Sequence, residues 1–134
     1  MQVSNLRKSS WECVHFFSND PSDLIKTELK DSNFQVFVIN NESIHNDQDL
    51  LEAISSAMKL PEYFGNNWDA LDESLSDFEE IHHAKGFILL IKNSKILWEK
   101  AAFSMGKLIR SWLFAAEEWS KDHIPFHLIF AEME

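Results

Sequence analysis

The side chains best suited to chemistry are seven carboxylates between residues 60 and 84, a stretch without lysine or arginine. They are Glu62, Asp69, Asp72, Glu73, Asp77, Glu79 and Glu80. The chain has 22 acidic and 12 basic residues and a formal net charge of −10, so about a fifth of it carries −7 of that total. Carboxylates this close together could exchange protons, hold a divalent cation or attract a basic surface. The ordinary structural explanation of such an acidic run is a helix face exposed to solvent. The spacing of the carboxylates must therefore distinguish this explanation from a functional one.

The spacing places most of these carboxylates on one side of a predicted helix. Asn67 can cap a helix that reaches about Phe78. At about 100° per residue, one side carries the apolar residues Trp68, Leu71, Leu75 and Phe78. The opposite side carries Asp69, Asp72, Glu73, Ser76, Asp77 and Glu80. Like charges three and four residues apart cost roughly a few tenths of a kcal/mol per pair, and no lysine offsets this cost. The pattern therefore indicates a surface for a basic partner.

The loop before this helix contains the only tyrosine of the chain, Tyr63, followed by Phe64 and Gly65. Gly65 is suited to a turn with positive φ. Aromatic rings beside a row of charges are typical of the centre of a protein-binding surface. The alternative interpretation is that Tyr63 and Phe64 fill the core and close the loop.

The stretch from Lys59 to Asp77, KLPEYFGNNWDALDESLSD, resembles the signature of the barstar family, which are intracellular protein inhibitors of secreted ribonucleases. The positions that match the signature are Leu60, Pro61, Tyr63, Phe64, Gly65, Asn67, Trp68, Asp69, Ala70, Leu71 and Leu75. The predicted order of strands and helices is also similar to that of the family. The resemblance extends from about Phe34 to Phe130, and residues 1–33 lie outside it.

The resemblance implies that the loop and the acidic helix insert into the active site of a basic ribonuclease, as a decoy for the RNA backbone. Tyr63, Gly65, Asn67 and Asp69 would occupy contact positions, and Glu73 would take the place of the most important aspartate of the family. The chain departs from the pattern where Asp72-Glu73-Ser74 replaces a frequent Trp-Asp-Cys, so an aromatic contact becomes Asp72. The full set of expected partner-binding residues is Tyr63, Phe64, Gly65, Asn66, Asn67, Trp68, Asp69, Asp72, Glu73, Ser76, Asp77 and, late in the long helix, Glu117, with Glu118 as its alternative.

The predicted strands and helices that must position this surface indicate an α/β fold. Three apolar runs are expected to be strands, and they are Phe34–Ile39, Phe87–Ile91 and Phe126–Phe130. Phe34–Ile39 is rich enough in apolar residues to predict a strand buried on both faces. Strands that alternate with helices favour parallel pairing. Together with the family resemblance, this order of elements predicts a small, barstar-like, three-stranded parallel sheet packed against helices.

The helices of this fold are expected between and before the strands. Asn46 or Asp47 can cap a helix with Leu50, Leu51, Ile54 and Met58 in the core. A long helix is predicted from Leu97 to about Trp119, although Gly106 could interrupt it. Residues 1–33 are expected to form an added N-terminal segment with a strand near Trp11–Phe17 and a short helix after Asp20-Pro21. Residues 34–134 would then form the barstar-like domain.

Composition excludes several other classes of function. Three glycines leave no phosphate-binding glycine loop, and a single cysteine, Cys13, cannot form an intramolecular disulfide or a multi-thiolate metal site. The negative charge disfavours nucleic acid as a direct partner, and no apolar run is long enough to span a membrane. We therefore expect no cofactor, no bound metal and a cytoplasmic location.

Two alternatives stay open at this point. The acidic surface could belong to an immunity protein that neutralises a different basic nuclease toxin. More remotely, Asp69, Asp72 and Glu73 could hold Mg²⁺ in a hydrolase. His82 and His83 are adjacent and point apart, so they do not make a zinc pair, and Cys13 is expected to be a buried small side chain.

Overall fold

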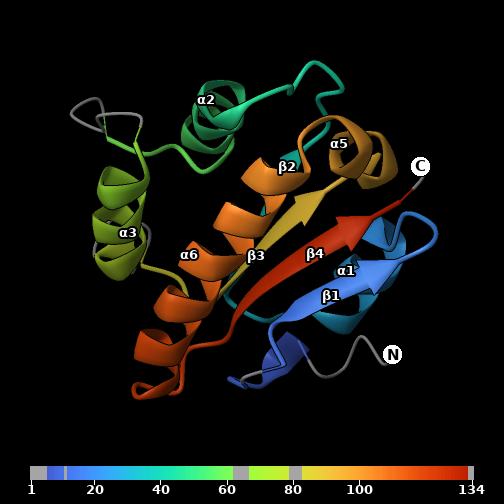
Figure 1. Ribbon diagram of the computed structural model, residues 1–134. Coiled ribbons are helices and arrows are strands. Elements are labelled where there is room, and N and C mark those ends of the chain that lie inside the picture. Colours follow the sequence, from blue (N-terminus) through green and yellow to red (C-terminus); the bar gives the residue numbers. More distant parts are fainter. Residues whose placement is uncertain (1–5, 11, 62–66, 79–82, 133–134) are drawn as a thin grey trace.

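A four-stranded, fully parallel sheet forms the centre of the computed structural model, which describes residues 6–10, 12–61, 67–78 and 83–132 (Figure 1). The strands lie in the order β1-β4-β3-β2. Their bounds are β1 (Val14–Phe17), β2 (Phe34–Ile39), β3 (Gly86–Ile91) and β4 (Phe126–Ala131). The predicted α/β class and parallel pairing are confirmed, but the expected count of three strands is wrong. The fourth strand is β1, which pairs in parallel with β4.

Helices cover both faces of the sheet. The helices are α1 (Ser22–Glu28), α2 (Asp47–Ala57), α3 (Trp68–Ser76), α5 (Ser94–Lys100) and α6 (Ala102–Ser120). Figure 1 shows α6 lying along one face of the sheet, with α2, α3 and α5 on the same side and α1 behind the opposite face. The larger core therefore lies under α6, where Trp112 and Phe126 stack at a ring separation of 4.3 Å. Across the described residues, no helix is long and apolar enough to cross a membrane.

The two central strands have the burial that their apolar sequences predict. Every residue of β3 and β4 is buried. The prediction that Phe34–Ile39 is buried on both faces is wrong, because β2 lies at the edge of the sheet. Val36 and Val38 are 42% and 45% exposed on it. An apolar run alone does not distinguish a central strand from an edge strand whose outer face is only half covered.

The predicted long helix is divided into two. It begins at Ser94, and its break lies at Ala101, whose φ of −140° and ψ of 45° end α5 and precede α6. Gly106 lies inside α6 without interrupting it, and a Cβ atom at Gly106 would contact nothing within 4 Å. The break allows α5 to pack over the ends of the strands while α6 runs along the sheet (Figure 1).

The segment before β2 is part of the same packed unit. Leu6 is fully buried in a cluster with Ile25 of α1, Leu29 at the end of α1 and the second face of the sheet. The Arg7 guanidinium donates to the Glu28 backbone carbonyl at 2.6 Å from Nη2 and 3.1 Å from Nε. The first part of the chain thus adds an edge strand beside β4 and a helix beneath the sheet.

Candidate protein-binding surface

The N-terminal cap of α3 has the predicted chemistry. Asn67 has extended backbone angles, and its Oδ1 accepts a hydrogen bond from the Ala70 amide at 2.8 Å. A side-chain oxygen in this position satisfies one of the free amides at the start of a helix. The helix ends at Ser76, with Asp77 as the C-terminal cap residue. Asn67 therefore sets the direction in which the helix leaves the preceding loop.

One side of α3 is buried and the other is anionic, as the helical spacing predicts. Leu71, Leu75 and the following Phe78 are fully buried. The acidic face of α3 consists of Asp69, Asp72, Glu73 and Asp77, all of them exposed. Within the described part of the chain, no lysine, arginine or histidine forms an ion pair with any of these four carboxylates. Their charge is therefore left to solvent and to any partner.

The helix that carries this face is held firmly in place. The indole nitrogen of Trp119 on α6 donates to the Leu75 backbone carbonyl at 2.8 Å. The Phe78 ring packs edge-on against Phe37 and Phe87, with ring centroids 5.5 and 4.8 Å away. Because buried aromatic contacts and a buried hydrogen bond both resist displacement, the carboxylates stand on a rigid support.

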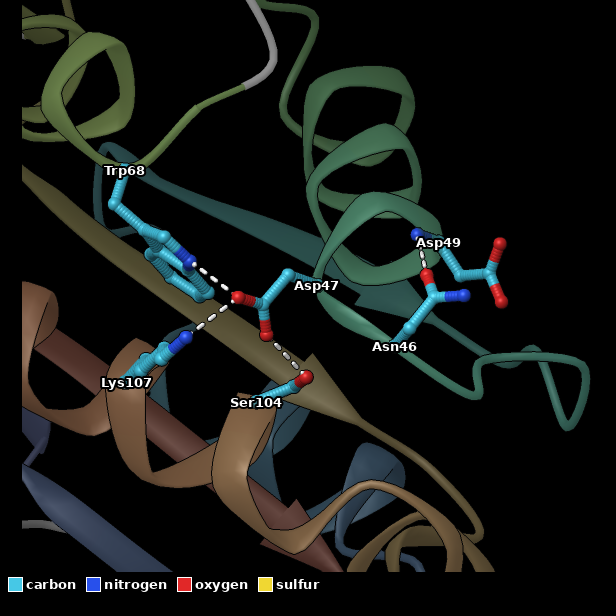
Figure 2. Close-up of polar contacts among 6 residues, drawn as sticks. All are labelled: Asn46, Asp47, Asp49, Trp68, Ser104 and Lys107. Atoms are coloured by element: carbon cyan, nitrogen blue, oxygen red, sulfur yellow. Dashed lines mark hydrogen bonds and ion pairs between the residues drawn. The ribbon is translucent and has the colours of Figure 1, made fainter.

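The first residue of α3 is tied to two other helices. Trp68 is half-buried against the core, and its Nε1 donates to Asp47 Oδ2 at 3.0 Å (Figure 2). Asp47 also accepts from Lys107 Nζ at 2.7 Å and Ser104 Oγ at 2.5 Å, both on α6. These hydrogen bonds, that of Lys107 foremost, lower the pKa of Asp47 from 3.8 to about 2. Trp68, which the sequence predicted to contact a partner, therefore also joins α3 to α2 through Asp47.

The sequence allowed either Asn46 or Asp47 to be the N-terminal cap residue of α2. The cap of α2 is instead Asn46, whose Oδ1 accepts from the Asp49 amide at 2.8 Å (Figure 2). This leaves the Asp47 carboxylate free to face Lys107. Sequence spacing carries no signal for a contact between residues 60 positions apart, so this three-helix junction could not be predicted.

The packing of α3 against α6 brings distant acidic residues together. A groove of about 400 Å³ between the two helices, the α3–α6 groove, contains Asp72 and Ser76 on one side and Glu117 and Glu118 on the other. The predicted residues Asp72, Ser76 and Glu117 thus share one surface, although Glu117 lies on a different helix. Three further lining residues, Ser111, Phe114 and Ala115, were not predicted, because nothing in the α6 sequence separates them from ordinary helix positions.

Several predicted residues cannot be placed on this surface. Tyr63, Phe64, Gly65 and Asn66 lie outside the described residues, as do Glu62, Glu79, Glu80 and His82. His83 is exposed. Among the residues that the structure describes, no group of three or more histidine, cysteine, aspartate or glutamate side chains could hold a metal ion.

Cys13 has the predicted environment of a small core side chain. It is almost completely buried, and burial raises the pKa of its thiol to about 11. A thiol with so high a pKa is almost entirely protonated near neutral pH and is a poor nucleophile.

Comparison with known proteins gives one family and a broader likeness in fold. The family model described as Barstar (barnase inhibitor) matches residues 34–131. No curated protein matches the sequence. Among solved structures, "Structure of the Aeropyrum Pernix ORC2 protein (ADP form)" superposes with a TM-score of 0.61 at 16% identity, over 96% of this chain and 38% of that one. The present chain therefore spans well under half of that structure, and the likeness concerns the fold alone.

Proposed function

Because the chain belongs to the barstar family, we propose that it is a protein inhibitor that binds and blocks the active site of a basic ribonuclease. The surface that would make this contact is the loop and helix of residues 63–77, with Glu117 on α6 beside it. The observation that carries the proposal is the acidic face of α3, which is exposed on a rigidly packed helix and forms no ion pair with any described residue.

The electrostatic part of the proposal follows from what a ribonuclease must do. An enzyme that holds the phosphates of RNA concentrates positive charge in its active site. A fixed row of carboxylates can occupy the same places as those phosphates. Charge complementarity of this kind speeds association and suppresses wrong partners more than it adds affinity.

Rigidity is the second part of the proposal. A flexible acidic segment would lose conformational entropy on binding, which weakens the complex. Here the Asn67 cap, the Trp68–Asp47 hydrogen bond and the Trp119–Leu75 hydrogen bond hold α3 before any partner arrives. We propose that the partner-binding residues are those expected from the sequence. They are Tyr63, Phe64, Gly65, Asn66, Asn67, Trp68, Asp69, Asp72, Glu73, Ser76, Asp77 and Glu117.

We further propose that the chain acts by binding and not by catalysis, and that residues 1–33 are an extension of a barstar-like domain formed by residues 34–134. The pairing of β1 with β4 supports a role for the extension in covering a sheet edge, where unpaired backbone groups invite unwanted strand pairing.

A binding and inhibition panel tests the proposal directly. The purified protein is mixed with basic ribonucleases and with nuclease toxin domains of other folds, and RNA cleavage is measured. Inhibition of a ribonuclease that is lost in Asp69→Asn/Glu73→Gln supports the proposal. The matched control is Glu99→Gln, an exposed glutamate on α5, which must inhibit like the parent. Inhibition confined to a nuclease toxin of another fold favours the immunity-protein alternative, and no inhibition anywhere contradicts both.

A further inference from the structure

Strand β2 is an open edge of the sheet and lacks the features that commonly prevent pairing with a further strand. Native edge strands are often short, bulged, or interrupted by lysine or proline. The sequence of β2, FQVFVI, has no charged residue and no proline, and all six of its residues pair in register with β3. On its other side, no strand of the described chain pairs with it.

The backbone groups on this open edge include those of Val36 and Val38. The Ile39 carbonyl accepts a hydrogen bond from the Lys92 amide at 2.8 Å, so the backbone groups of Ile39 face β3. Successive residues of a strand direct their backbone groups to opposite edges, so the N–H and C=O groups of Val36 and Val38 point away from β3. Within the described part of the chain, no turn, loop or cap forms a backbone hydrogen bond with either valine. A strand from outside can therefore pair with them.

An apolar groove of about 370 Å³, the α1-side groove, follows this edge on the face of the sheet that carries α1. Its floor includes the half-exposed side chains of Val36 and Val38, and Ile25 and Lys26 of α1 stand on its other side. Lys26 is the only charged residue among the described residues that line it. Apolar side chains of an added strand would cover the two valines, whereas a basic side chain would be repelled by Lys26.

A second groove borders the same edge on the face that carries α2, and its chemistry is different. This α2-side groove, of about 430 Å³, is lined by the carboxylates of Asp49 and Glu52 and by no described lysine, arginine or histidine. Each carboxylate accepts one hydrogen bond from a neutral donor, and neither forms an ion pair with the described residues. Val38 lines both grooves. The edge of β2 therefore lies between an apolar groove and an anionic one.

We propose that β2 binds an extended segment of another protein as an additional strand, a segment in which basic side chains alternate with apolar ones. The side chains of a strand point alternately to the two faces of a sheet. The basic side chains would enter the α2-side groove and meet Asp49 and Glu52, while the apolar ones would enter the α1-side groove and cover Val36 and Val38. Backbone hydrogen bonds would provide attachment, and the two grooves would select the sequence.

A second copy of this chain fits the same edge poorly. Its β2 has no basic residue to place beside Asp49 and Glu52. Pairing two β2 strands about a twofold axis would also bring the two anionic α2-side grooves next to each other, in chains that each carry a net charge of −10. Charge complementarity therefore favours a basic strand from a different protein. The two grooves share no residue with the acidic face of α3 or with the α3–α6 groove, so this inference does not depend on the proposed function.

Synthetic peptides test the proposal on the full chain. The probe is the alternating peptide acetyl-Thr-Lys-Val-Lys-Val-Lys-Thr-amide, and its binding is followed by NMR shifts of backbone amides. The controls are acetyl-Thr-Lys-Lys-Lys-Val-Val-Thr-amide, which has the same composition without alternation, and the alternating peptide with glutamate in place of lysine. Saturable shifts are expected in β2, α1 and α2, with the probe binding at least about threefold more tightly than either control. At saturation, the amides of Val36 and Val38 should gain protection from hydrogen exchange.

Backbone methylation of the probe tests strand pairing itself. Methyl groups are placed on the valine amide nitrogens in one peptide and on the lysine amide nitrogens in another. Only one of these two sets of amides can face β2, because alternate residues direct their amides to opposite edges. One methylated peptide must therefore lose binding while the other keeps it. If the two behave alike, strand pairing is contradicted.

The charge of the α2-side groove is tested with Glu52→Lys, which should weaken the probe by at least about threefold. The matched control is Glu99→Lys, the same change at an exposed residue of α5 that lines neither groove, and it should bind like the parent. Equal binding by the two variants, or no saturable binding of the probe to the parent, overturns the proposal. Sedimentation of the chain alone should show a monomer, and a dimer that is lost in Val38→Lys would identify a second copy as the occupant and overturn it.

Discussion

The Nε2 atom of His15 on β1 lies 2.8 Å from the Nδ1 atom of His127 on β4, so two buried imidazoles join the first and last strands of the sheet. His127 Nε2 lies 2.8 Å from the Lys8 backbone carbonyl, which can only accept. His127 must therefore carry its proton on Nε2, and its free Nδ1 must accept from the Nε2–H of His15. In the neutral state, both ring nitrogens of His127 and the Nε2–H of His15 therefore take part in hydrogen bonds.

The histidine pair predicts a loss of stability in mild acid. Burial, with the neighbouring His127 as a lesser cause, lowers the pKa of His15 from 6.5 to about 4, and burial also lowers the pKa of His127. Between about pH 6.5 and 4 the unfolded chain binds more protons than the folded chain, so the free energy of unfolding must fall as the pH is lowered through this window. Urea unfolding from pH 7.5 to 4 measures the slope.

The variant His15→Asn/His127→Asn should flatten that slope, whatever its own stability. The control is His45→Asn, because His45 is exposed. Among the described residues, no carboxylate is a cause of the lowered pKa of either histidine. A parent protein whose stability is level from pH 7.5 to 4 would contradict the assignment.

Removing the charge of Asp47 should destabilise the three-helix junction. Asp47→Asn weakens the bonds to Lys107, Ser104 and Trp68, and we expect a loss of about 1 kcal/mol, since the Asp47 and Lys107 side chains are each more than a third exposed and solvent screens them. The depressed pKa of Asp47 means that its contribution is present at neutral pH and is lost only as the pH falls toward about 2. Chemical denaturation at pH 7 measures the loss, and Glu99→Gln, which should be silent, is the control.

The acidic face of α3 should contribute little to stability. Glu73→Ala and Asp69→Ala each remove an exposed carboxylate that forms no ion pair with the described residues, so the free energy of unfolding should change by less than about 0.5–1 kcal/mol. Glu73→Ala also relieves repulsion from its neighbours and is the more favourable of the two, whereas Asp69 lies near the positive end of the helix. Thermal melts check both, and a large loss would reassign these residues to structure.

Association with the target should depend strongly on salt. The exposed carboxylates of α3 attract a basic partner over a distance of about 10 Å at 0.1 M ionic strength, and added salt shortens this range. Stopped-flow association rates are therefore expected to fall steeply between low and high salt, with a smaller change in the dissociation rate. Rates that do not vary with salt would show that the acidic face does not guide the encounter.

The purified protein should not hydrolyse RNA or phosphate esters, with or without Mg²⁺. The carboxylates on α3 are exposed, and an acid–base pair for catalysis needs environments that separate the two pKa values. Turnover assays with Mg²⁺ and with a chelator test this. Metal-dependent turnover that disappears in Asp69→Ala would restore the hydrolase alternative.

Local patterns predicted what is local in the molecule. The cap Asn67, the buried side of α3 and its exposed carboxylates follow from helical spacing and side-chain chemistry, both of which act within a few residues, and the cap of α2 was narrowed to Asn46 or Asp47. The strands β3 and β4 were likewise visible as apolar runs. These features need no knowledge of distant parts of the chain.

Features that depend on contacts between distant parts of the chain could not be predicted from the sequence. The exposure of Val36 arises because β2 has a neighbour on one side only, and the joining of β1 to β4 depends on residues more than 100 positions apart. The Asp47 junction and the Phe114 side of the α3–α6 groove each require helices to be placed in space first. Tertiary packing decides such positions, and single-sequence periodicity does not contain them.

The pairing of β1 with β4 has a consequence for how the protein is made. β1 leaves the ribosome more than 100 residues before β4, so β1 cannot pair with β4 until β4 has been synthesised. Closing so long a loop is slow compared with forming the helices between them. β1 must therefore remain without its β4 partner while the strands and helices between them are synthesised.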